Sequence, residues 1–408
     1  MAEKYPSLNI VMKVKIGKLK NTFAIMSLIV LFVLFPVYHD LVARGLVSSV
    51  FGGWFGPWAF VVFFVFLFSS SQYFLNDLGK GRGFSVMVVT MIFYICLVSI
   101  INAGFSSNPH VDKAVSQSLT TSFLWLALIF LAIHTPLDAS ALLSVLWISF
   151  IGSTAFLLHF VITTGSLMYY PAMLFSVEQG VASYQGFARS ALVVAFFLLA
   201  SSDSSRIRFL IGLLGVFVLF VLGARSEFFV FILSFFTFEF LRTKLSFSYI
   251  WFWLVLIIGA VFSVTYFWQD FLSSRHGEIL RLSESSSWAL RSEAFDRTMQ
   301  AISENAFFGS FGSHILPNGE AGLYAHNIFS AWQSYGLPGF LLILTICIWA
   351  TFGAFEAVRR NRGESIISNY AFLLNFCVLF LLLVSKSVFW VVPGLAWGLY
   401  IAMERQSS

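Results

Sequence analysis

Long apolar runs recur along the whole chain, and only short polar stretches separate them. Of the 408 residues, 59% are hydrophobic and 11% are charged, and the mean hydropathy is +0.86. A soluble domain usually carries about 25% charged residues. A chain of this composition cannot keep its surface in water as a globule. The sequence therefore predicts a polytopic membrane protein and excludes a soluble enzyme, a disordered chain and a secreted disulfide scaffold.

The apolar runs predict an all-α fold, a transmembrane helix bundle that forms one integral membrane domain over residues 1–408. A bilayer core of about 30 Å needs roughly 20 apolar residues per helix. About twelve runs approach that length, although several are short or adjoin the next run. The expected spans are 23–38, 55–71, 84–104, 119–134, 139–164, 188–202, 207–223, 227–241, 249–268, 327–352, 368–385 and 388–402.

The basic residues indicate the orientation of these spans. Lysines precede the first apolar run, and no small-residue cleavage site follows it, so this end is expected to be a cytoplasmic anchor. Fifteen of the 24 Lys and Arg residues then fall on the inner side and nine on the outer side. This bias predicts two cytoplasmic termini. Because the basic residues are scattered between apolar segments, we expect membrane lipids and no nucleic acid as partners.

The one long extramembrane segment is the outer loop 269–325. Its middle predicts an amphipathic helix, because apolar residues recur there at helical spacing. These residues are Trp288, Phe295, Met299 and Ile302. Glu293 and Arg297 have the favourable i,i+4 order of an ion pair. Arg291 lies off the apolar stripe and has no such neighbour, so we expect it to be freer to meet a ligand.

Polar residues stand at three outer helix ends. His326 opens the tenth expected span, and Asn327 beside it could orient a substrate or cap the helix. A histidine there can exchange protons near neutrality, or it can simply bond to backbone at the helix end. Arg225 interrupts two apolar runs and Arg189 opens another. Such charges are usually functional or paired, and Glu227 is a candidate partner for Arg225. Because these helix ends share the outer side, we expect Arg189, Arg225 and His326 to meet at one face, with Arg291 above them.

The outer side holds more Arg than Lys, whereas the inner side holds nearly equal numbers. The planar guanidinium suits phosphate or carboxylate binding, so this excess indicates an anionic ligand on the outer side. The alternatives are pairing with outer acids or contact with lipid headgroups. The three Cys fall within apolar runs and the seven His show no ligand spacing, so we expect no metal and no cofactor.

Three stretches, taken together and in this order, resemble the bacterial O-antigen polymerases and O-antigen ligases, which form one superfamily of membrane glycosyltransferases. They are Gly223–Ser226, Arg291–Gly312, and Ala325–Asn327 followed by Gly336 and Gly339. The topology with one long outer loop before the tenth span is similar too. The chain departs from the family pattern at 307–312, which lacks the usual proline, and at 185–189, where many relatives carry an Asn-rich turn.

The resemblance implies glycosyl transfer at the periplasmic face of the bacterial inner membrane, in lipopolysaccharide biosynthesis. The donor would be an oligosaccharide repeat unit on undecaprenyl diphosphate. The acceptor would be another lipid-linked repeat unit for a polymerase, which we favour, or lipid A–core for a ligase. A chain-length regulator is a further candidate partner. The transfer would be inverting and would need no metal.

The resemblance also implies roles for particular residues. His326 would be the general base or would orient the acceptor, and Arg189, Arg225 and Arg291 would stabilise the departing diphosphate. The expected substrate-binding residues are Arg189, Arg281, Arg297, Asn327 and Tyr324.

Two readings from other classes remain beside the enzyme. A transporter of lipid-linked glycans also suits a bundle of about twelve spans with both ends inside. The sequence shows no matching pair of Gly- or Pro-broken segments in its two halves, and its polar residues gather outside the expected spans. A structural scaffold would leave the outward arginines without a role.

Overall fold

The computed structural model describes residues 6–48, 54–79, 83–106, 110–169, 184–242, 286–316, 319, 322 and 324–406. These residues are helical throughout, apart from turns and loops, and contain no β-strand. The first half of the chain forms α1 (Pro6–Ile29), the π-helical η1 (Val30–Leu34), α2 (Phe35–Ala43), α3 (Phe55–Gly79), α4 (Gly83–Phe105), α5 (Val111–His134), α6 (Ser140–Thr164) and α8 (Tyr184–Ser201). The second half forms α9 (Ser205–Val221), α10 (Arg225–Arg242), α13 (Ser286–Glu304), α14 (Phe329–Asn361), α15 (Ile366–Val384) and α16 (Val392–Gln406).

Seven helical stretches in the described part of the chain are long and apolar enough to cross a membrane. They are Gly17–Val42, Phe55–Gln72, Gly83–Phe105, Val111–His134, Ser140–Thr164, Phe329–Asn361 and Ile366–Val384. The chain is therefore an all-helical, multi-pass membrane protein, as predicted. Shorter or more charged helices, α8, α9, α10 and α16, lie at four further expected spans. The expected span 249–268 lies outside the described residues, so the count of twelve stays a prediction.

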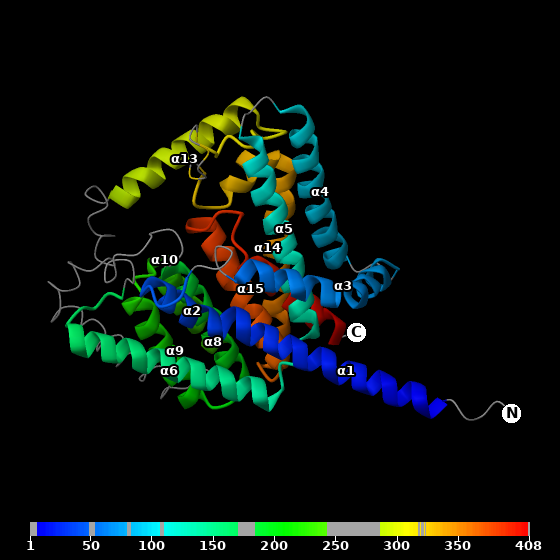
Figure 1. The fold of residues 1–408 in the computed structure, drawn as a ribbon, viewed down its shortest axis with the longest axis vertical. Coiled ribbons are helices and arrows are strands. Elements are labelled where there is room, and N and C mark those ends of the chain that lie inside the picture. Colours follow the sequence, from blue (N-terminus) through cyan, green and yellow to red (C-terminus); the bar gives the residue numbers. More distant parts are fainter. Residues whose placement is uncertain are drawn as a thin grey trace.

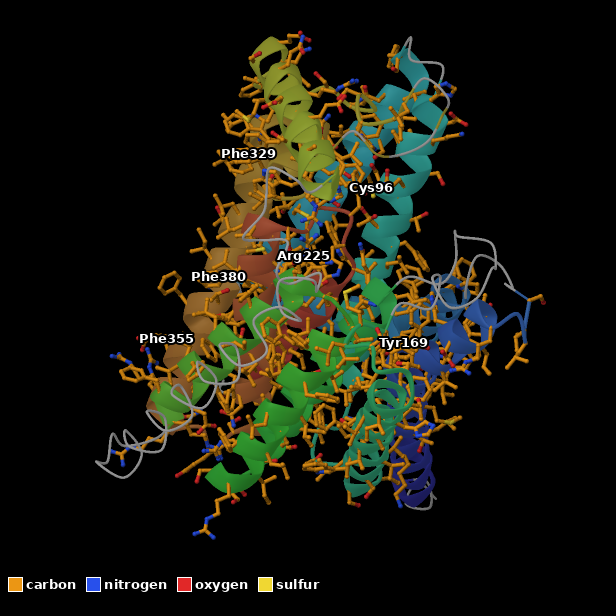
Figure 2. All side chains as sticks on the ribbon, turned by 90° about the vertical axis from the view of Figure 1, so that its left-hand side faces the viewer. Cys96, Tyr169, Arg225, Phe329, Phe355 and Phe380 are labelled. Carbon is orange, nitrogen blue, oxygen red and sulfur yellow. The ribbon has the colours of Figure 1, made fainter. Side chains whose placement is uncertain are left out.

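Most helices pack as a bundle, and α13 lies across one end of it (Figure 1). In the view turned by 90°, Arg225 marks the start of α10, at a level below α13 (Figure 2). The turn after α15 reaches the same region, because its Val388 N donates to the hydroxyl of Ser330 in α14 at 2.8 Å. Segments distant in sequence therefore meet under α13.

Two glycines in α16 allow its close contact with α5. A Cβ on Gly394 would lie 2.6 Å from the Cα of Trp125, and one on Gly398 would lie 2.7 Å from the Cα of Ile129. Small residues four apart are the usual means by which membrane helices bring their backbones together. The contact fixes the turn that precedes α16, because the Trp125 indole donates to Trp390 O at 2.8 Å.

Helix α14 breaks at Gly336, which has φ 68° and ψ −175°. A Cβ there would lie 2.1 Å from Phe307 O, so the position needs glycine both for its backbone angle and for the close approach. The break frees backbone groups for other partners. Leu337 N donates to Ala306 O and Phe307 O at 3.1 Å each, and Tyr335 O accepts from the Tyr94 hydroxyl at 2.8 Å. The turn after α13 is thereby fastened to α14.

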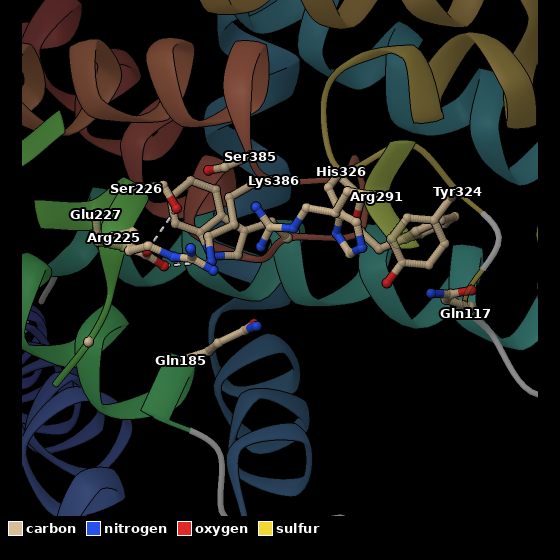
Figure 3. A pocket seen from close by; sticks show the side chains of 14 residues that line it. Gln117, Gln185, Arg225, Ser226, Glu227, Arg291, Tyr324, His326, Ser385 and Lys386 are labelled. Carbon is tan, nitrogen blue, oxygen red and sulfur yellow. Dashed lines mark hydrogen bonds and ion pairs between the residues drawn. The ribbon is translucent and has the colours of Figure 1, made fainter. Parts of the chain in front are cut away.

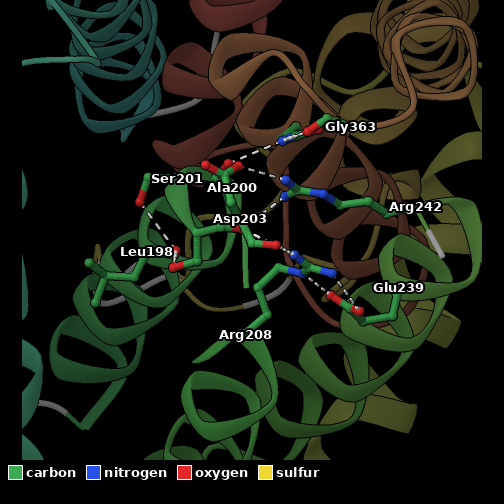
Figure 4. Close-up of polar contacts among 10 residues, drawn as sticks. Leu198, Ala200, Ser201, Asp203, Arg208, Glu239, Arg242 and Gly363 are labelled. Atoms are coloured by element: carbon green, nitrogen blue, oxygen red, sulfur yellow. Dashed lines mark hydrogen bonds and ion pairs between the residues drawn. The ribbon is translucent and has the colours of Figure 1, made fainter. Parts of the chain in front are cut away.

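A second polar cluster, which we call the charge clasp, joins α8, α9 and α10 at the end of α10 opposite to Arg225 (Figure 4). It consists of Ser202, Asp203, Arg208, Glu239 and Arg242. The Arg208 guanidinium forms a two-point ion pair with Glu239 and also donates to Ser202 O and Asp203 O. Arg242 pairs with Asp203 at 3.0 Å and donates to Ser202 O. Its two positive and two negative charges cancel.

Candidate functional site

A cavity of about 320 Å³ lies where α5, α8, α10, α13, the loop before α14 and the turn after α15 meet. Its lining residues come from segments that the topology predicted from the sequence places at outer helix ends or in the long outer loop. We call it the cationic pocket. It is lined by Gln117, Gln185, Gly223, Arg225, Ser226, Glu227, Arg291, Tyr324, His326, Ser385, Lys386, Ser387, Phe389 and Trp390.

Four of the predicted site residues therefore come together: Arg225, Arg291, Tyr324 and His326 line the same cavity. In Figure 3, Arg291 and His326 lie in the middle of the row, and Arg225 lies toward one end. Residues 225, 291 and 326 reach this place from three different elements. The sequence predicts that these three residues meet together with Arg189, and the structure brings three of the four together.

Arg291 reaches the pocket because it lies on the packed face of α13. Residues at i, i+4, i+7 and i+11 share one face of a helix. Counted from Arg291, that face carries Phe295, Thr298 and Ile302. The predicted apolar stripe was partly wrong, because Trp288 and Met299 are 49% and 39% exposed, while Ile302 is buried. Arg291 thus belongs to the inward face of the helix and does not lie off it.

Thr298 joins α13 to the loop that carries His326. Its side chain is fully buried, accepts a hydrogen bond from Ala325 N at 2.9 Å and donates to Gln333 Oε1 at 3.0 Å. Ala325 directly precedes His326, and Thr298 lies two turns after Arg291 on the same face. This one hydroxyl therefore fixes the position of the arginine relative to the imidazole.

His326 is held in its neutral form. Burial lowers its pKa, and the positive charges of Arg291 and Lys386 lower it further. Its ring lies beside that of Tyr324, with 5.3 Å between the centroids. Among the described residues, neither ring nitrogen of His326 has a hydrogen-bond partner. A neutral imidazole with an available lone pair can accept a proton at neutral pH.

The part of the pocket formed by α10 and the turn after α15 carries a buried ion pair that the sequence did not predict. Lys386 Nζ lies 2.5 Å from Glu227 Oε1, and their side chains are 13% and 4% exposed. The Ser226 hydroxyl donates to the other carboxylate oxygen at 3.1 Å. Glu227, the expected partner of Arg225, is thus engaged with Lys386 and Ser226. The pocket lining holds three cations and one carboxylate, so its net charge is positive with His326 neutral.

Sequence reasoning missed Lys386 and Gln117. A signal existed for Lys386, because it is the sole charged residue between the last two apolar runs, 368–385 and 388–402. Arg225 interrupts two apolar runs in the same way. Gln117 offered no comparable signal, since it is one polar residue among several at the start of α5.

Arg189 does not join the pocket. Its guanidinium lies over the rings of Phe35 and Phe55, with 4.9 Å and 4.1 Å to their centroids. The negative faces of these rings attract the positive guanidinium and stabilise it in this position. Its Nε atom is buried and has no hydrogen-bond partner among the residues that the structure describes. The structure therefore separates Arg189 from Arg225, with which it was expected to converge.

Other predicted binding residues also have different surroundings. Arg297 forms the expected pair with Glu293 at 2.6 Å on the exposed side of α13, so the pairing predicted from their spacing is confirmed. The Asn327 carboxamide oxygen accepts from Phe329 N at 3.0 Å, which supports its capping alternative at the start of α14. Arg281 lies outside the described residues. Within the part of the chain that the structure describes, no ion pair involves Arg291.

The arrangement suits an anionic ligand. Arg225, Arg291 and Lys386 offer guanidinium and ammonium donors, and hydroxyls of Ser226 and Ser387 lie among them. In the described residues, no three His, Cys, Asp or Glu side chains gather as a metal cluster, and we assign no residue to a metal. No family model, curated protein or solved structure matches this chain.

Proposed function

We propose that the chain is a membrane glycosyltransferase of the O-antigen polymerase type. It would transfer a glycan from undecaprenyl diphosphate to the sugar end of another lipid-linked repeat unit, at the periplasmic face of the bacterial inner membrane. The observation that carries the proposal is the meeting of Arg225, Arg291 and His326 in one cationic pocket. The resemblance of these three segments to the polymerase and ligase family supports it.

The cations would act on the leaving group. As the glycosidic bond breaks, negative charge builds on the diphosphate, and donors already in place stabilise it without reorganisation. Arg291 suits this role because no described carboxylate neutralises it, and Arg225 and Lys386 extend the positive surface. Glu227 holds Lys386 at 2.5 Å and so fixes the position of its ammonium group.

His326 would act on the acceptor. The acceptor hydroxyl oxygen attacks the anomeric carbon, its proton passes to the free imidazole nitrogen, and the bond from carbon to the diphosphate oxygen breaks with its electron pair. Undecaprenyl diphosphate leaves, and one displacement inverts the anomeric centre. The lowered pKa keeps His326 unprotonated and ready for this step.

A lipid-linked substrate also agrees with the place of the pocket. Its walls are the ends of α10 and α15 and the loop before α14, and α14 and α15 are apolar enough to span a membrane. A diphosphate bound among these helix ends would leave its isoprenoid tail beside the apolar helices. The twelve-span topology with both termini cytoplasmic belongs to the same proposal.

Reconstitution of the purified chain with lipid-linked repeat units alone tests this function. We expect a ladder of lengthening glycans without nucleotide sugar or added metal, and no ladder from His326→Ala. Transfer only after lipid A–core is added would change the assignment to a ligase. No product in either arm, with the donor shown to be intact, would contradict a glycosyltransferase.

A further inference from the structure

The cationic pocket has two chemically different ends. Arg225, Ser226 and Glu227 lie at one end of the row, and Gln117 and Tyr324 lie at the other (Figure 3). The described side chains at the Gln117 end are uncharged: an amide, a phenol and, beside them, the Phe389 ring. Arg291 and His326 lie between the two ends. An anionic group suits the first end, whereas the second suits a neutral ligand with hydroxyl groups and an apolar face.

Gln117 is held by a histidine that the catalytic proposal does not use. His314 Nε2 lies 2.9 Å from Gln117 Oε1, and the His314 side chain is fully buried. Its ring also lies beside the rings of Tyr324 and Phe389, at 5.9 Å and 5.1 Å between centroids. His314 therefore contacts the three residues that form the neutral end of the pocket.

The protonation of His314 sets the direction of the Gln117 amide. Burial lowers the pKa of His314 to about 4, so the ring is neutral at pH 7 and carries one N–H. An amide oxygen only accepts, so the proton is on Nε2 and donates to Gln117. The reverse arrangement would put the proton on the buried Nδ1. This atom has no hydrogen-bond partner in the described part of the chain, and a buried unpaired donor is costly.

With its oxygen engaged, Gln117 has its NH₂ group left to donate. This nitrogen makes no hydrogen bond within the described part of the chain, and the side chain lines the cavity. The Tyr324 ring stands beside it and is edge-on to Phe389 at 5.6 Å. Directed N–H donors at an aromatic wall match a sugar ring, which offers hydroxyl oxygens at its edge and C–H groups on its face.

We propose that the Gln117 end of the cationic pocket is a sugar subsite, where Gln117 donates to a glycan hydroxyl and buried His314 positions it. This inference rests on the proposed function and names the part of the substrate that this end binds. Gln117 is the binding residue. His314 acts through it and does not contact the reacting atoms.

The test compares two probes on the purified protein in nanodiscs. One is an undecaprenyl-diphosphate-linked repeat unit, and the other is glycan-free undecaprenyl diphosphate. Gln117→Leu removes the donor at similar volume, and His314→Phe keeps the ring packing but removes the N–H. His314→Gln supplies a new N–H donor, and Gln300→Leu changes an exposed glutamine of α13 outside the pocket.

We expect the wild type to bind the glycan-bearing lipid more tightly than undecaprenyl diphosphate. Gln117→Leu and His314→Phe should each weaken binding of the glycan-bearing lipid by about fivefold to tenfold, the effect of one lost hydrogen bond. Binding of undecaprenyl diphosphate should not change in either variant. The double variant Gln117→Leu, His314→Phe should lose no more affinity for the glycan-bearing lipid than Gln117→Leu alone. His314→Gln should recover part of the affinity that His314→Phe loses, and Gln300→Leu should bind both probes like the wild type.

Equal binding of both probes by the wild type would overturn the sugar subsite. So would a loss of undecaprenyl diphosphate binding in His314→Phe, because His314 would then be structural. The outcome for the sugar subsite can be distinguished from the outcome for the proposed function. Binding effects without a glycan ladder would support the sugar subsite and contradict the polymerase assignment. A glycan ladder without these binding effects would support the polymerase assignment and contradict the sugar subsite.

Discussion

The cationic pocket and the charge clasp both gather arginines and carboxylates at helix ends, and α10 contributes to both. Arg225 and Glu227 begin the helix, and Glu239 and Arg242 end it. At 1.5 Å per residue, the first and last of these lie about 25 Å apart along the axis. This length approaches the hydrocarbon thickness of a bilayer, about 30 Å. The two clusters thus mark the two ends of one apolar helix.

They differ in how their charges are used. In the clasp, two cations meet two carboxylates, and the Arg208 guanidinium is fully engaged by Glu239 and backbone oxygens. In the pocket, three cations meet one carboxylate, and no described carboxylate pairs with Arg291. A neutralised cluster stabilises the fold, whereas a surplus of positive charge around a cavity favours an anionic ligand. We therefore expect clasp variants to change stability and pocket variants to change activity.

The largest expected effect is on activity, at His326. His326→Ala removes the proposed base and should lower the rate of glycan transfer by roughly 10²- to 10⁴-fold, the usual contribution of general base catalysis. The thermal midpoint of the reconstituted protein should stay close to that of the wild type, because His326 makes no hydrogen bond with a described residue. Transfer rates from lipid-linked repeat units measure the first quantity and thermal unfolding the second. A variant that retains full activity would exclude His326 as the base.

The clasp should show the opposite pattern. Glu239→Ala leaves the Arg208 charge buried and uncompensated, which typically costs about 3–5 kcal/mol. The double variant Arg208→Met, Glu239→Leu replaces the pair with apolar groups and should recover most of that loss. Unfolding of the purified protein in detergent measures both changes. Equal losses in the single and double variants would show that the ion pair itself supplies the stability.

Arg291 and Arg297 form a matched pair on one helix. Arg291→Ala should lower transfer by roughly 10²- to 10³-fold, as the loss of one preorganised donor to a developing anion does. Arg297→Ala should remain within about twofold, because an exposed i,i+4 pair contributes only about 0.3–0.5 kcal/mol. Parallel rate measurements on the two variants test the difference. Equal losses would indicate that the charge of α13 as a whole matters, and the position of Arg291 does not.

A smaller effect is expected where α13 is joined to the loop that carries His326. Thr298→Val removes a buried hydroxyl and leaves Ala325 N without its acceptor, at a cost of about 1–3 kcal/mol. Because the same hydroxyl fixes Arg291 relative to His326, transfer should fall together with stability. Thr298→Ser keeps the hydroxyl and should preserve both. Normal transfer by Thr298→Val would show that the hydrogen bonds of Thr298 do not affect catalysis.

The pH profile gives the finest test. The neutral form of His326 is the active one, so transfer should fall as the pH drops through its pKa, which lies below the ordinary value of 6.5. Arg291→Gln removes one of the cations that lower this pKa, so the acid limb of its residual activity should move to higher pH. A limb that stays in place would show that another group controls the profile.

The sequence anticipated features that depend on local spacing. Hydropathy located the apolar helices, and the i,i+4 rule predicted the pair of Glu293 and Arg297. The helix face on which Arg291 lies could also be predicted, because Arg291, Thr298 and Ile302 have the spacing of one face. The apolar residues alone do not show this face, because Trp288 is half exposed.

Features that depend on packing between distant helices could not be anticipated. Glu227 and Lys386 meet because α10 packs beside α15, a contact to which neither segment alone gives any clue. Arg189 leaves the expected site because Phe35 and Phe55 from two other helices cover it. The convergence of Arg225, Arg291 and His326 was expected from their positions at outer helix ends, but their spacing in the sequence does not require it.

The most direct test of the account is the release of undecaprenyl diphosphate by the reconstituted protein when lipid-linked repeat units are the only substrate. We expect the wild type to release one molecule for each glycosidic bond formed. Release should be near normal for Arg297→Ala and almost absent for His326→Ala and Arg291→Ala, with all three variants shown to be folded by their thermal unfolding. Release by His326→Ala at the wild-type rate, or none by the wild type with an intact donor, would contradict the proposed mechanism.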